Sequence, residues 1–193
     1  MDDIWLARHG ATAWSVARRH TSTTDLDLIP EGIRQATELG RRLADHRFTV
    51  VLSSPLLRAR RTAELAGFGT HLELDDDLME FRYGDYEGVT TADIIARRPG
   101  WNLWTDGCPG GETATDVGRR ADSVLTRLKS LEGSVLLFGH GHALRILAAR
   151  WLGLGAEAGQ LLALDAATLS ILGLEHRRPV VKLWNDGCHL VER

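Results

Sequence analysis

Arg8, His9, Arg58 and His140 are the side chains of this chain whose types and positions best suit chemistry on an anion. Arg8 and His9 follow one short apolar segment, His140 follows another, and Arg58 lies near the start of a predicted helix. A cation is unfavourable at the positive end of a helix dipole, so the position of Arg58 is easier to explain if an anion binds beside it. Ligands of open α/β sheets bind beyond the carboxyl ends of the strands. We therefore expect these four side chains to converge on one anion-binding site.

The neighbours of His9 favour a reactive role for this residue. A lone histidine at the end of a strand is more often structural than catalytic. Here, however, Arg8 places a fixed positive charge next to the imidazole. Gly10 follows directly, and a residue without a side chain would let the backbone approach a ligand closely.

The His140-Gly141-His142 segment allows two interpretations. The N–H groups at the start of the helix predicted for residues 142–152 would bind an anion, and a protonated His140 would add a charged donor. Alternatively, the two histidines are metal ligands. Side chains that alternate along a strand point to opposite faces, and no carboxylate cluster with the usual ligand spacing lies near them. We favour the anion site and keep a metallohydrolase as an alternative.

Short apolar segments alternate along the chain with segments whose apolar residues recur at helical spacing. Strands are predicted at residues 4–7, 49–52, 134–138, 168–174 and 180–184, and helices at 30–44, 54–65, 113–131 and 142–152. The first helix should begin at Pro30 and include Ile33 in its apolar face. The second should begin with Ser54 as its hydroxyl cap.

This alternation predicts an α/β fold: a three-layer sandwich with a mostly parallel central sheet and helices on both faces. Residues 86–112, rich in Gly, Pro and Trp with one short predicted helix at 92–97, interrupt the pattern. We expect residues 1–193 to form a single domain in which 86–112 is a small lid-like insertion. Trp101 and Trp104 of that insertion would either grip a substrate or cover the core, and the sequence does not decide between these roles.

Five motifs resemble, in the right order, those of the histidine phosphatase (phosphoglycerate mutase-like) superfamily. They are residues 8–14 (RHGATAW), 54–63 (SPLLRARRTA), 78–88 (LMEFRYGDYEG), 110–113 (GGET) and 138–145 (FGHGHALR). The resemblance covers nearly the whole chain. Residues 75–78, 83–88, 101–108 and 139–142 are most similar to the branch of bacterial acid phosphatases and fungal sedoheptulose-bisphosphatase.

The resemblance implies an enzyme that takes a phosphoryl group onto His9 and then passes it to water. Arg8, Arg58 and His140 would supply the positive charge around the phosphate, so neither a metal nor another cofactor is expected. The residues implied to contact the substrate are Arg8, Ser15, Arg58, His140, Gly141 and His142. Ser15 stands where mutases of the family usually carry an asparagine, so its contact would be a single hydroxyl hydrogen bond.

Glu80 is implied to be the general acid, which gives a proton to the leaving oxygen and later activates water. For this task we expect Glu80 to be partly buried, near Phe81. Glu87 is the alternative acid. Glu112 is expected to cap a helix rather than to meet the substrate. In residues 21–23, Ser22 replaces a glycine that is common in the family, so no role is assigned to that loop.

The favoured function is a metal-independent phosphomonoesterase that acts on small phosphorylated metabolites, sugar phosphates included, through a phosphohistidine. Two further alternatives are phosphoglycerate mutase-type phosphoryl transfer and a non-catalytic module that binds a phosphorylated ligand. Mutases of the family carry an Arg-Arg-containing lid segment where this chain has residues 101–105 (WNLWT), which favours hydrolysis.

Composition is consistent with this interpretation. The 193 residues are 44% hydrophobic and 25% charged, as in globular proteins, and carry a net charge of −3. This charge argues against nucleic acid as a partner, and the absence of an apolar run of about 20 residues argues against a membrane span. The acidic N-terminus shows no signal peptide, and the two cysteines, Cys108 and Cys188, are far apart. We therefore expect a cytoplasmic enzyme whose partner is a small phosphorylated substrate, with a monomer and a homodimer both left open.

Overall fold

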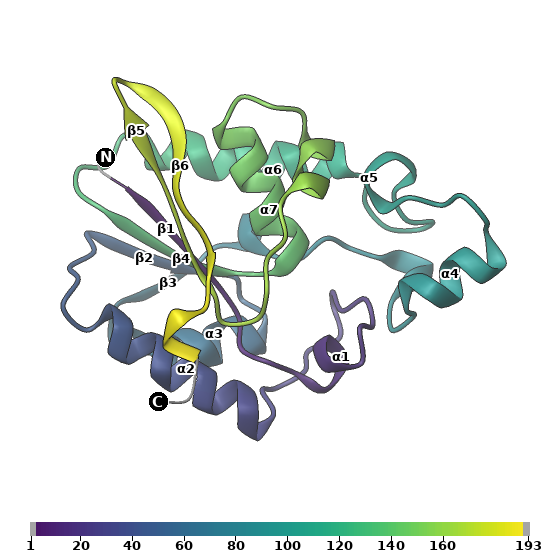
Figure 1. The fold of residues 1–193 in the computed structure, drawn as a ribbon, viewed down its shortest axis with the longest axis horizontal. Helices are drawn as coiled ribbons and strands as arrows, with labels where there is room; N and C mark the ends of the chain where they lie inside the picture. Colours follow the sequence, from purple (N-terminus) through teal and green to yellow (C-terminus); the bar gives the residue numbers. More distant parts are fainter. Residues whose placement is uncertain (1–2, 191–193) are drawn as a thin grey trace.

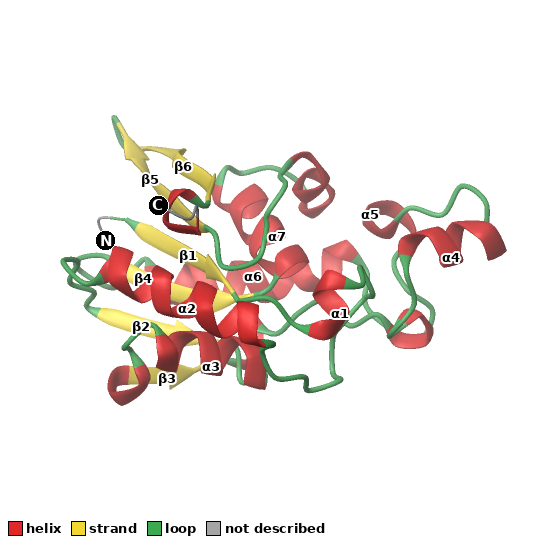
Figure 2. Ribbon diagram, turned by 60° about the horizontal axis from the view of Figure 1, so that its bottom comes forward, coloured by secondary structure: helices red, strands yellow, loops and turns green. Residues whose placement is uncertain are grey.

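The computed structural model describes residues 3–190, which form a six-stranded sheet with helices on both faces (Figures 1 and 2). The strands are β1 (Ile4–Arg8), β2 (Val50–Ser53), β3 (Leu72–Leu74), β4 (Val135–Gly139), β5 (Leu169–Glu175) and β6 (Arg178–Asp186), in the spatial order β3-β2-β4-β1-β5-β6. Strands β1 to β4 are parallel, whereas β5 and β6 add to one side in antiparallel orientation. The predicted α/β fold with a mostly parallel sheet is confirmed. The sequence does not predict β3, because three residues are too few to show a strand period.

Two apolar cores lie on opposite faces of the sheet, because successive side chains of a strand point to opposite sides. Ile4 and Leu6 of β1 pack in the larger core with α6 (Ala114–Leu128) and α7 (Gly141–Trp151). Ala7 of the same strand packs in the smaller core with α2 (Pro30–Leu43) and α3 (Leu57–Leu65). Figure 2 shows α2 in front of the sheet and α6 behind it, which confirms the three layers.

Helix α2 begins at Pro30 as predicted, since proline suits the first position of a helix. The prediction that Ile33 belongs to its buried face is wrong, because Ile33 is 40% exposed. Gly32 lies on the buried face instead. A Cβ at this position would lie 2.1 Å from the Ala11 carbonyl oxygen, so only glycine allows this close approach of backbone to backbone.

The remaining helices, α1 (Ala13–Val16), α4 (Thr91–Arg97) and α5 (Leu103–Asp106), lie beyond the carboxyl ends of the parallel strands in both views (Figures 1 and 2). Helices α4 and α5 belong to residues 86–112, which extend away from the sheet. The single-domain organisation and the lid-like role of this segment stay predictions. Across residues 3–190, no helix is both long enough and apolar enough to cross a membrane.

Candidate active site

The carboxyl ends of three neighbouring strands bring the predicted histidines together. The N–H of His9 donates to the Gly139 carbonyl at 3.0 Å, which joins the end of β1 to the end of β4. On the other side of β4, the N–H of Ser54 donates to the Phe138 carbonyl at 3.0 Å and aligns the end of β2. The ring centroids of His9 and His140 are consequently 5.2 Å apart. The sheet thus places two histidines from distant segments side by side.

His9 has the tautomer that a nucleophile needs. Its Nδ1 lies 2.8 Å from the Gly10 carbonyl oxygen, which can only accept, so Nδ1 carries the proton and Nε2 keeps a lone pair. Burial, followed by the charges of Arg8 and Arg58, lowers the pKa of His9 well below its usual value. The ring is therefore neutral at pH 7, and its Nε2 can attack an electrophile such as phosphorus.

The role of Gly10 differs from the one predicted. A Cβ on Gly10 would lie 2.5 Å from the Gly32 carbonyl oxygen, so the absence of a side chain allows close contact with α2 rather than with a ligand. The N–H of Gly10 donates to the Thr62 hydroxyl at 3.0 Å, which ties this turn to α3. Both contacts hold the segment that carries His9.

Arg8 and Arg58 bring two positive charges close to His9. Arg58 is completely buried and Arg8 is half-buried, and desolvation lowers the pKa of both guanidinium groups. Neither takes part in an ion pair among the described residues. The Nε of each is buried and has no hydrogen-bond partner in that part of the chain. Buried unpaired donors are rare, and an anion between these two groups would satisfy both.

Arg58 also holds the loop for which the sequence gave no role. Its guanidinium donates to the carbonyl oxygens of Thr21 and Ser22, both at 3.1 Å, and of Thr24 at 3.3 Å. From the other side, the Glu87 carboxylate accepts from the N–H groups of Ser22 and Thr24. Glu87 is a poor alternative to Glu80 as the general acid because, unlike Glu80, it does not line the cavity that opens beside His9.

His140 is neutral as well, contrary to the prediction of a protonated ring. Burial and the charge of Arg58 lower its pKa well below the usual value. Its Nε2 lies 2.8 Å from the Ser54 hydroxyl, which also accepts from the Leu56 N–H at 3.3 Å. The other ring nitrogen, Nδ1, is buried and has no partner among the described residues. Ser54 therefore orients His140, and the prediction that it caps α3 is wrong because Leu56 is the N-cap residue.

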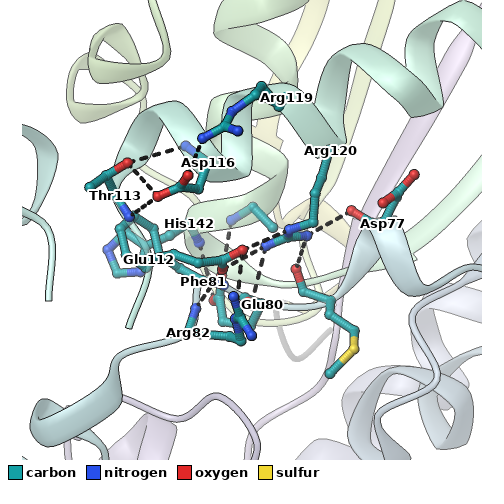
Figure 3. Close-up of polar contacts among 12 residues, drawn as sticks. Asp77, Glu80, Phe81, Arg82, Glu112, Thr113, Asp116, Arg119, Arg120 and His142 are labelled. Atoms are coloured by element: carbon teal, nitrogen blue, oxygen red, sulfur yellow. Dashed lines mark hydrogen bonds and ion pairs between the residues drawn. The ribbon is translucent and has the colours of Figure 1, made fainter. Parts of the chain in front are cut away.

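The Glu80 carboxylate is buried at the start of α7 (Figure 3). It accepts from the N–H groups of His142 at 3.2 Å and Ala143 at 2.9 Å, and from its neighbour Phe81 at 2.9 Å. The burial expected for a general acid is confirmed, with 6% of Glu80 exposed. The prediction that the N–H groups at the start of this helix bind a substrate anion is corrected, because the N–H groups of His142 and Ala143 bind a carboxylate of the protein itself.

An ion pair between half-buried Arg120 and buried Glu112 fixes the segment that carries Glu80 (Figure 3). Arg120 of α6 donates from Nη1 to the carbonyl oxygens of Asp77 at 2.8 Å and Met79 at 3.0 Å. Its Nε and Nη2 each donate to the Glu112 carboxylate at 3.0 Å. Glu112 in turn accepts from the Arg82 N–H at 2.9 Å, so the segment is tied on both sides of the general-acid position.

The prediction that Glu112 caps a helix is therefore wrong. The N-cap of α6 is Thr113, which forms a capping box with Asp116. Glu112 lies directly before this cap and points to Arg120 instead. That it does not meet the substrate stays a prediction.

A cavity of about 330 Å³ opens beside these groups. The predicted site residues in its wall are Arg8, His9, Ser15, Glu80, Gly141 and His142. Arg58 and His140 have no part in the wall, because both are completely buried beside His9. The Ser15 hydroxyl accepts from the Thr12 N–H and donates to the Thr12 carbonyl, so its contact with a substrate stays a prediction.

A second cavity, of about 400 Å³, adjoins the first. His20, Thr91 and His142 lie in the walls of both. Sequence reasoning missed His20, since an isolated histidine in a loop belongs to none of the recognised motifs. Only the three-dimensional contact with Tyr83 and Trp101 places it here.

The two tryptophans of the insertion have different surroundings. Trp101 is 5% exposed, belongs to the larger core, and donates its indole N–H to the Gly107 carbonyl at 2.9 Å. Trp104 is half-buried, and the Arg145 guanidinium lies 4.5 Å from its ring centroid. Both rings line the second cavity. Trp101 covers the core, and Trp104 has the greater exposure toward a ligand.

The histidines considered as metal ligands have other partners. His140 contacts Ser54, and Nδ1 of His142 lies 2.7 Å from the Tyr83 hydroxyl. Within residues 3–190, no group of three or more His, Cys, Asp or Glu side chains could hold a metal ion. Independence from metal stays a prediction about activity.

A parallel sheet that presents a neutral histidine beside two arginines, with a buried carboxylate nearby, suits an enzyme that transfers phosphoryl groups through histidine. The family model of the histidine phosphatase superfamily (branch 1) matches residues 4–187, and the chain belongs to this family. It is a phosphatase, as the resemblance of its motifs implied.

Similar proteins support the predicted branch. The chain is 40% identical over 177 residues to an acid phosphatase from Mycobacterium tuberculosis, covering 90% of this chain and 87% of the relative. It is 37% identical over 184 residues to sedoheptulose 1,7-bisphosphatase from Saccharomyces cerevisiae, covering 79% and 68%. The solved structure of the Rv3214 product from M. tuberculosis superposes with a TM-score of 0.90 at 36% identity, covering 95% and 97%.

Proposed function

We propose that this chain hydrolyses phosphate monoesters of small metabolites, sugar phosphates included, through a phosphohistidine at His9 and without a metal ion. The observation that carries the proposal is the state of His9. Its Nδ1–H is bound to the Gly10 carbonyl, its Nε2 keeps the lone pair, and its surroundings lower its pKa. A histidine with only a structural role has no need of this combination beside two arginines that have no ion-pair partner among the described residues.

In the first step, Nε2 of His9 attacks phosphorus while the bond to the leaving oxygen breaks. Catalysis of this step depends mainly on positioning and on charge around the phosphoryl oxygens. Arg8 and Arg58 supply that charge, and neutral His140 adds a donor when the ring proton is on its unpartnered Nδ1. These groups take the part that a divalent cation has in other phosphatases.

Glu80 gives its proton to the leaving oxygen, which departs as an alcohol. In the second step Glu80, now a carboxylate, takes a proton from water as the water oxygen attacks the phosphohistidine. The nitrogen–phosphorus bond breaks, inorganic phosphate leaves, and His9 returns to its neutral form. The three N–H groups that bind Glu80 keep its carboxylate in one position through both steps.

Two observations support sugar phosphates as substrates. The yeast relative is named for a sugar bisphosphate. The second cavity is lined by polar and aromatic side chains, which suits a leaving group with both hydroxyl groups and an apolar face. We also propose a cytoplasmic location, which two cysteines far apart in sequence support.

The test is His9→Ala, measured on p-nitrophenyl phosphate and on a sugar phosphate. Loss of the nucleophile should lower kcat on the order of 10⁴-fold or more, and trapped phosphoenzyme should disappear. In the unmodified chain the trapped species should be labile to acid and stable to alkali, as a phosphoramidate is. The exposed His71 provides a matched control, since His71→Ala should keep full activity. Full turnover by a folded His9→Ala protein would refute the proposal.

Chelation tests the metal-independent part. Activity should be unchanged after exhaustive treatment with EDTA, because Arg8 and Arg58 already carry the charge. Restoration of a lost activity by a divalent ion would instead support the metallohydrolase. With phosphoglycerates, phosphate release should exceed interconversion of the isomers, and the opposite result would support the mutase.

A further inference from the structure

Two histidines at the junction of the cavities have no part in the phosphoryl transfer described above. His20 and His142 each lie in the walls of both cavities. Their ring planes are nearly parallel, at 15°, and the ring centroids are 6.3 Å apart. Any leaving group that extends from the phosphate at His9 into the second cavity has to pass this pair.

The tautomer of His20 makes its free nitrogen an acceptor. Nδ1 lies 2.8 Å from the Val89 carbonyl oxygen, so Nδ1 carries the proton. Burial lowers the pKa of His20, which keeps the ring neutral at pH 7. Nε2 has no described partner and is absent from the buried unpaired atoms, so it is accessible from the cavity.

The tautomer of His142 makes its free nitrogen a donor. Its Nδ1 lies 2.7 Å from the hydroxyl of Tyr83, which has no other hydrogen-bond partner among the described residues. Burial raises the pKa of Tyr83 well above its usual value, so the phenol keeps its proton and needs an acceptor for it. Nδ1 of His142 is that acceptor, because burial also keeps this ring neutral by lowering its pKa. The ring proton is therefore on Nε2, which is accessible from the cavity like its counterpart.

Among the described residues, no charged side chain lines the cavity beyond the pair. The other residues that line it are Thr91, Trp101, Asn102, Leu103, Trp104 and Gln160. In contrast, Arg18, Arg19 and Arg145 join Arg8 in the wall of the phosphate cavity. Glu80 and Asp165 also line the phosphate cavity, so its four arginines outnumber its acidic groups, whereas neutral polar and aromatic groups lie where the leaving group extends.

We propose that His20 and His142 form a hydroxyl-recognition pair that selects polyhydroxylated leaving groups, with one substrate hydroxyl donating to Nε2 of His20 and another accepting from Nε2–H of His142. This inference rests on the proposed phosphatase function and adds the class of substrate that the site prefers. A leaving group without hydroxyls would cover both nitrogens and leave them unpaired. Such a loss discriminates strongly between substrates, because buried polar groups without partners are costly.

The test compares two primary alkyl esters with six-membered rings, glucose 6-phosphate and cyclohexylmethyl phosphate, which lacks hydroxyls. The measured quantity is the ratio of their kcat/KM values, since changes in the phosphate step common to both esters cancel in it. The chain should prefer glucose 6-phosphate by about 10-fold or more. His20→Phe and His142→Phe keep a ring but remove the polar nitrogen, and each should lower the ratio roughly 5- to 10-fold, mainly through KM.

Two further variants keep the test decisive. His20→Gln places an amide oxygen near the position of Nε2 and should recover part of the preference, which a general packing defect would not allow. The control His71→Phe makes the same exchange at an exposed histidine and should leave the ratio unchanged. Equal kcat/KM values for the two esters in the unmodified chain, or an unchanged ratio in both folded phenylalanine variants, would overturn the pair. If neither ester nor p-nitrophenyl phosphate is hydrolysed and no phosphohistidine forms, the phosphatase function itself has failed.

Discussion

The two halves of the phosphoryl-transfer site are held in place by different means. Arg8, His9 and His140 lie at the ends of neighbouring parallel strands, whose backbone hydrogen bonds set their spacing. Glu80 lies on an irregular segment, and side chains from elsewhere hold it: the start of α7 binds its carboxylate, and Arg120 binds the carbonyl groups before it.

This difference teaches where the site tolerates change. The strand ends are part of the sheet, so displacing His9 requires disruption of the core on both faces. The segment of Glu80 has few backbone partners in the sheet and depends on particular polar contacts with α6 and α7. Substitutions far from the phosphate should therefore damage proton transfer before they damage the attack by His9.

The largest effect expected from this comparison is that of Glu80→Gln. Glutamine keeps the size and one acceptor but cannot give up a proton, so phosphorylation by an alkyl phosphate should slow by about 10²–10⁴-fold. A nitrophenyl phosphate leaves as a stable phenolate and should lose clearly less. Single-turnover measurement of the phosphorylation step separates this loss from any effect on dephosphorylation.

Equal losses on the two substrates would assign Glu80 a positional role only. Glu87 or Asp85, both close in sequence, would then be the next acid to test. Glu87→Gln serves as a comparison. It should lower the hydrolysis rates of alkyl and aryl phosphates alike. The substitution weakens the contacts that hold the loop of Ser22 and Thr24 but leaves the proton donor Glu80 in place.

The same comparison explains what the sequence could predict. The sheet-built half follows from periodicity, because apolar strands that alternate with amphipathic helices place Arg8, His9 and His140 at one edge. The positions of Arg58 and Glu80 also followed from motifs. The partners of these groups did not: that Ser54 orients His140 rather than capping α3 depends on contacts across the sheet.

The neutral form of His140 could not be predicted from the sequence either. Its neutral form results from complete burial next to Arg58, which no local sequence pattern encodes. His20 was missed for the same reason, since its position in the cavity wall is a property of the fold. Sequence therefore predicts what backbone hydrogen bonding builds, and less of what buried side chains arrange among themselves.

Arg58→Gln should have an intermediate effect on kcat. Arg58 lies in α3, and its charge acts on His9 at the end of β1. Loss of one preorganised donor in a site of this kind costs about 10²–10³-fold in kcat. The charge of Arg58 helps to lower the pKa of His9, so its removal raises that pKa toward the usual histidine value. Since protonated His9 cannot attack, the acid limb of the kcat/KM profile should move to higher pH.

The control for this shift is Arg58→Lys, which keeps the positive charge but not the planar fork. The kcat of Arg58→Lys should fall. The acid limb of its kcat/KM profile should stay at a pH below the usual histidine pKa, as in the unmodified chain. An acid limb at the same pH in Arg58→Gln would show that burial and the charge of Arg8 lower the pKa of His9 without a contribution from Arg58.

The smallest effect on kcat is expected when the ion pair between Arg120 and Glu112 is weakened. This effect reports on the irregular segment that carries Glu80. Arg120→Lys removes the fork that holds Glu112 and the carbonyl oxygens of Asp77 and Met79. Loss of about 1 kcal/mol of positioning corresponds to roughly 5-fold, which should appear in kcat for alkyl phosphates and only weakly for nitrophenyl phosphate. Arg119→Lys, on the neighbouring exposed arginine, should change neither.

A double substitution decides whether Arg120 acts through Glu80. If Arg120 only positions the proton donor, Arg120→Lys should add almost nothing to the loss already caused by Glu80→Gln, because the group to be positioned can no longer give a proton. If instead Arg120 stabilises the fold in general, the two losses should multiply, since independent effects are additive in free energy. Thermal melting of each variant, compared with Arg119→Lys, shows how much stability is lost in either case. Full multiplication of the two kinetic losses would break the proposed link between the ion pair and proton transfer.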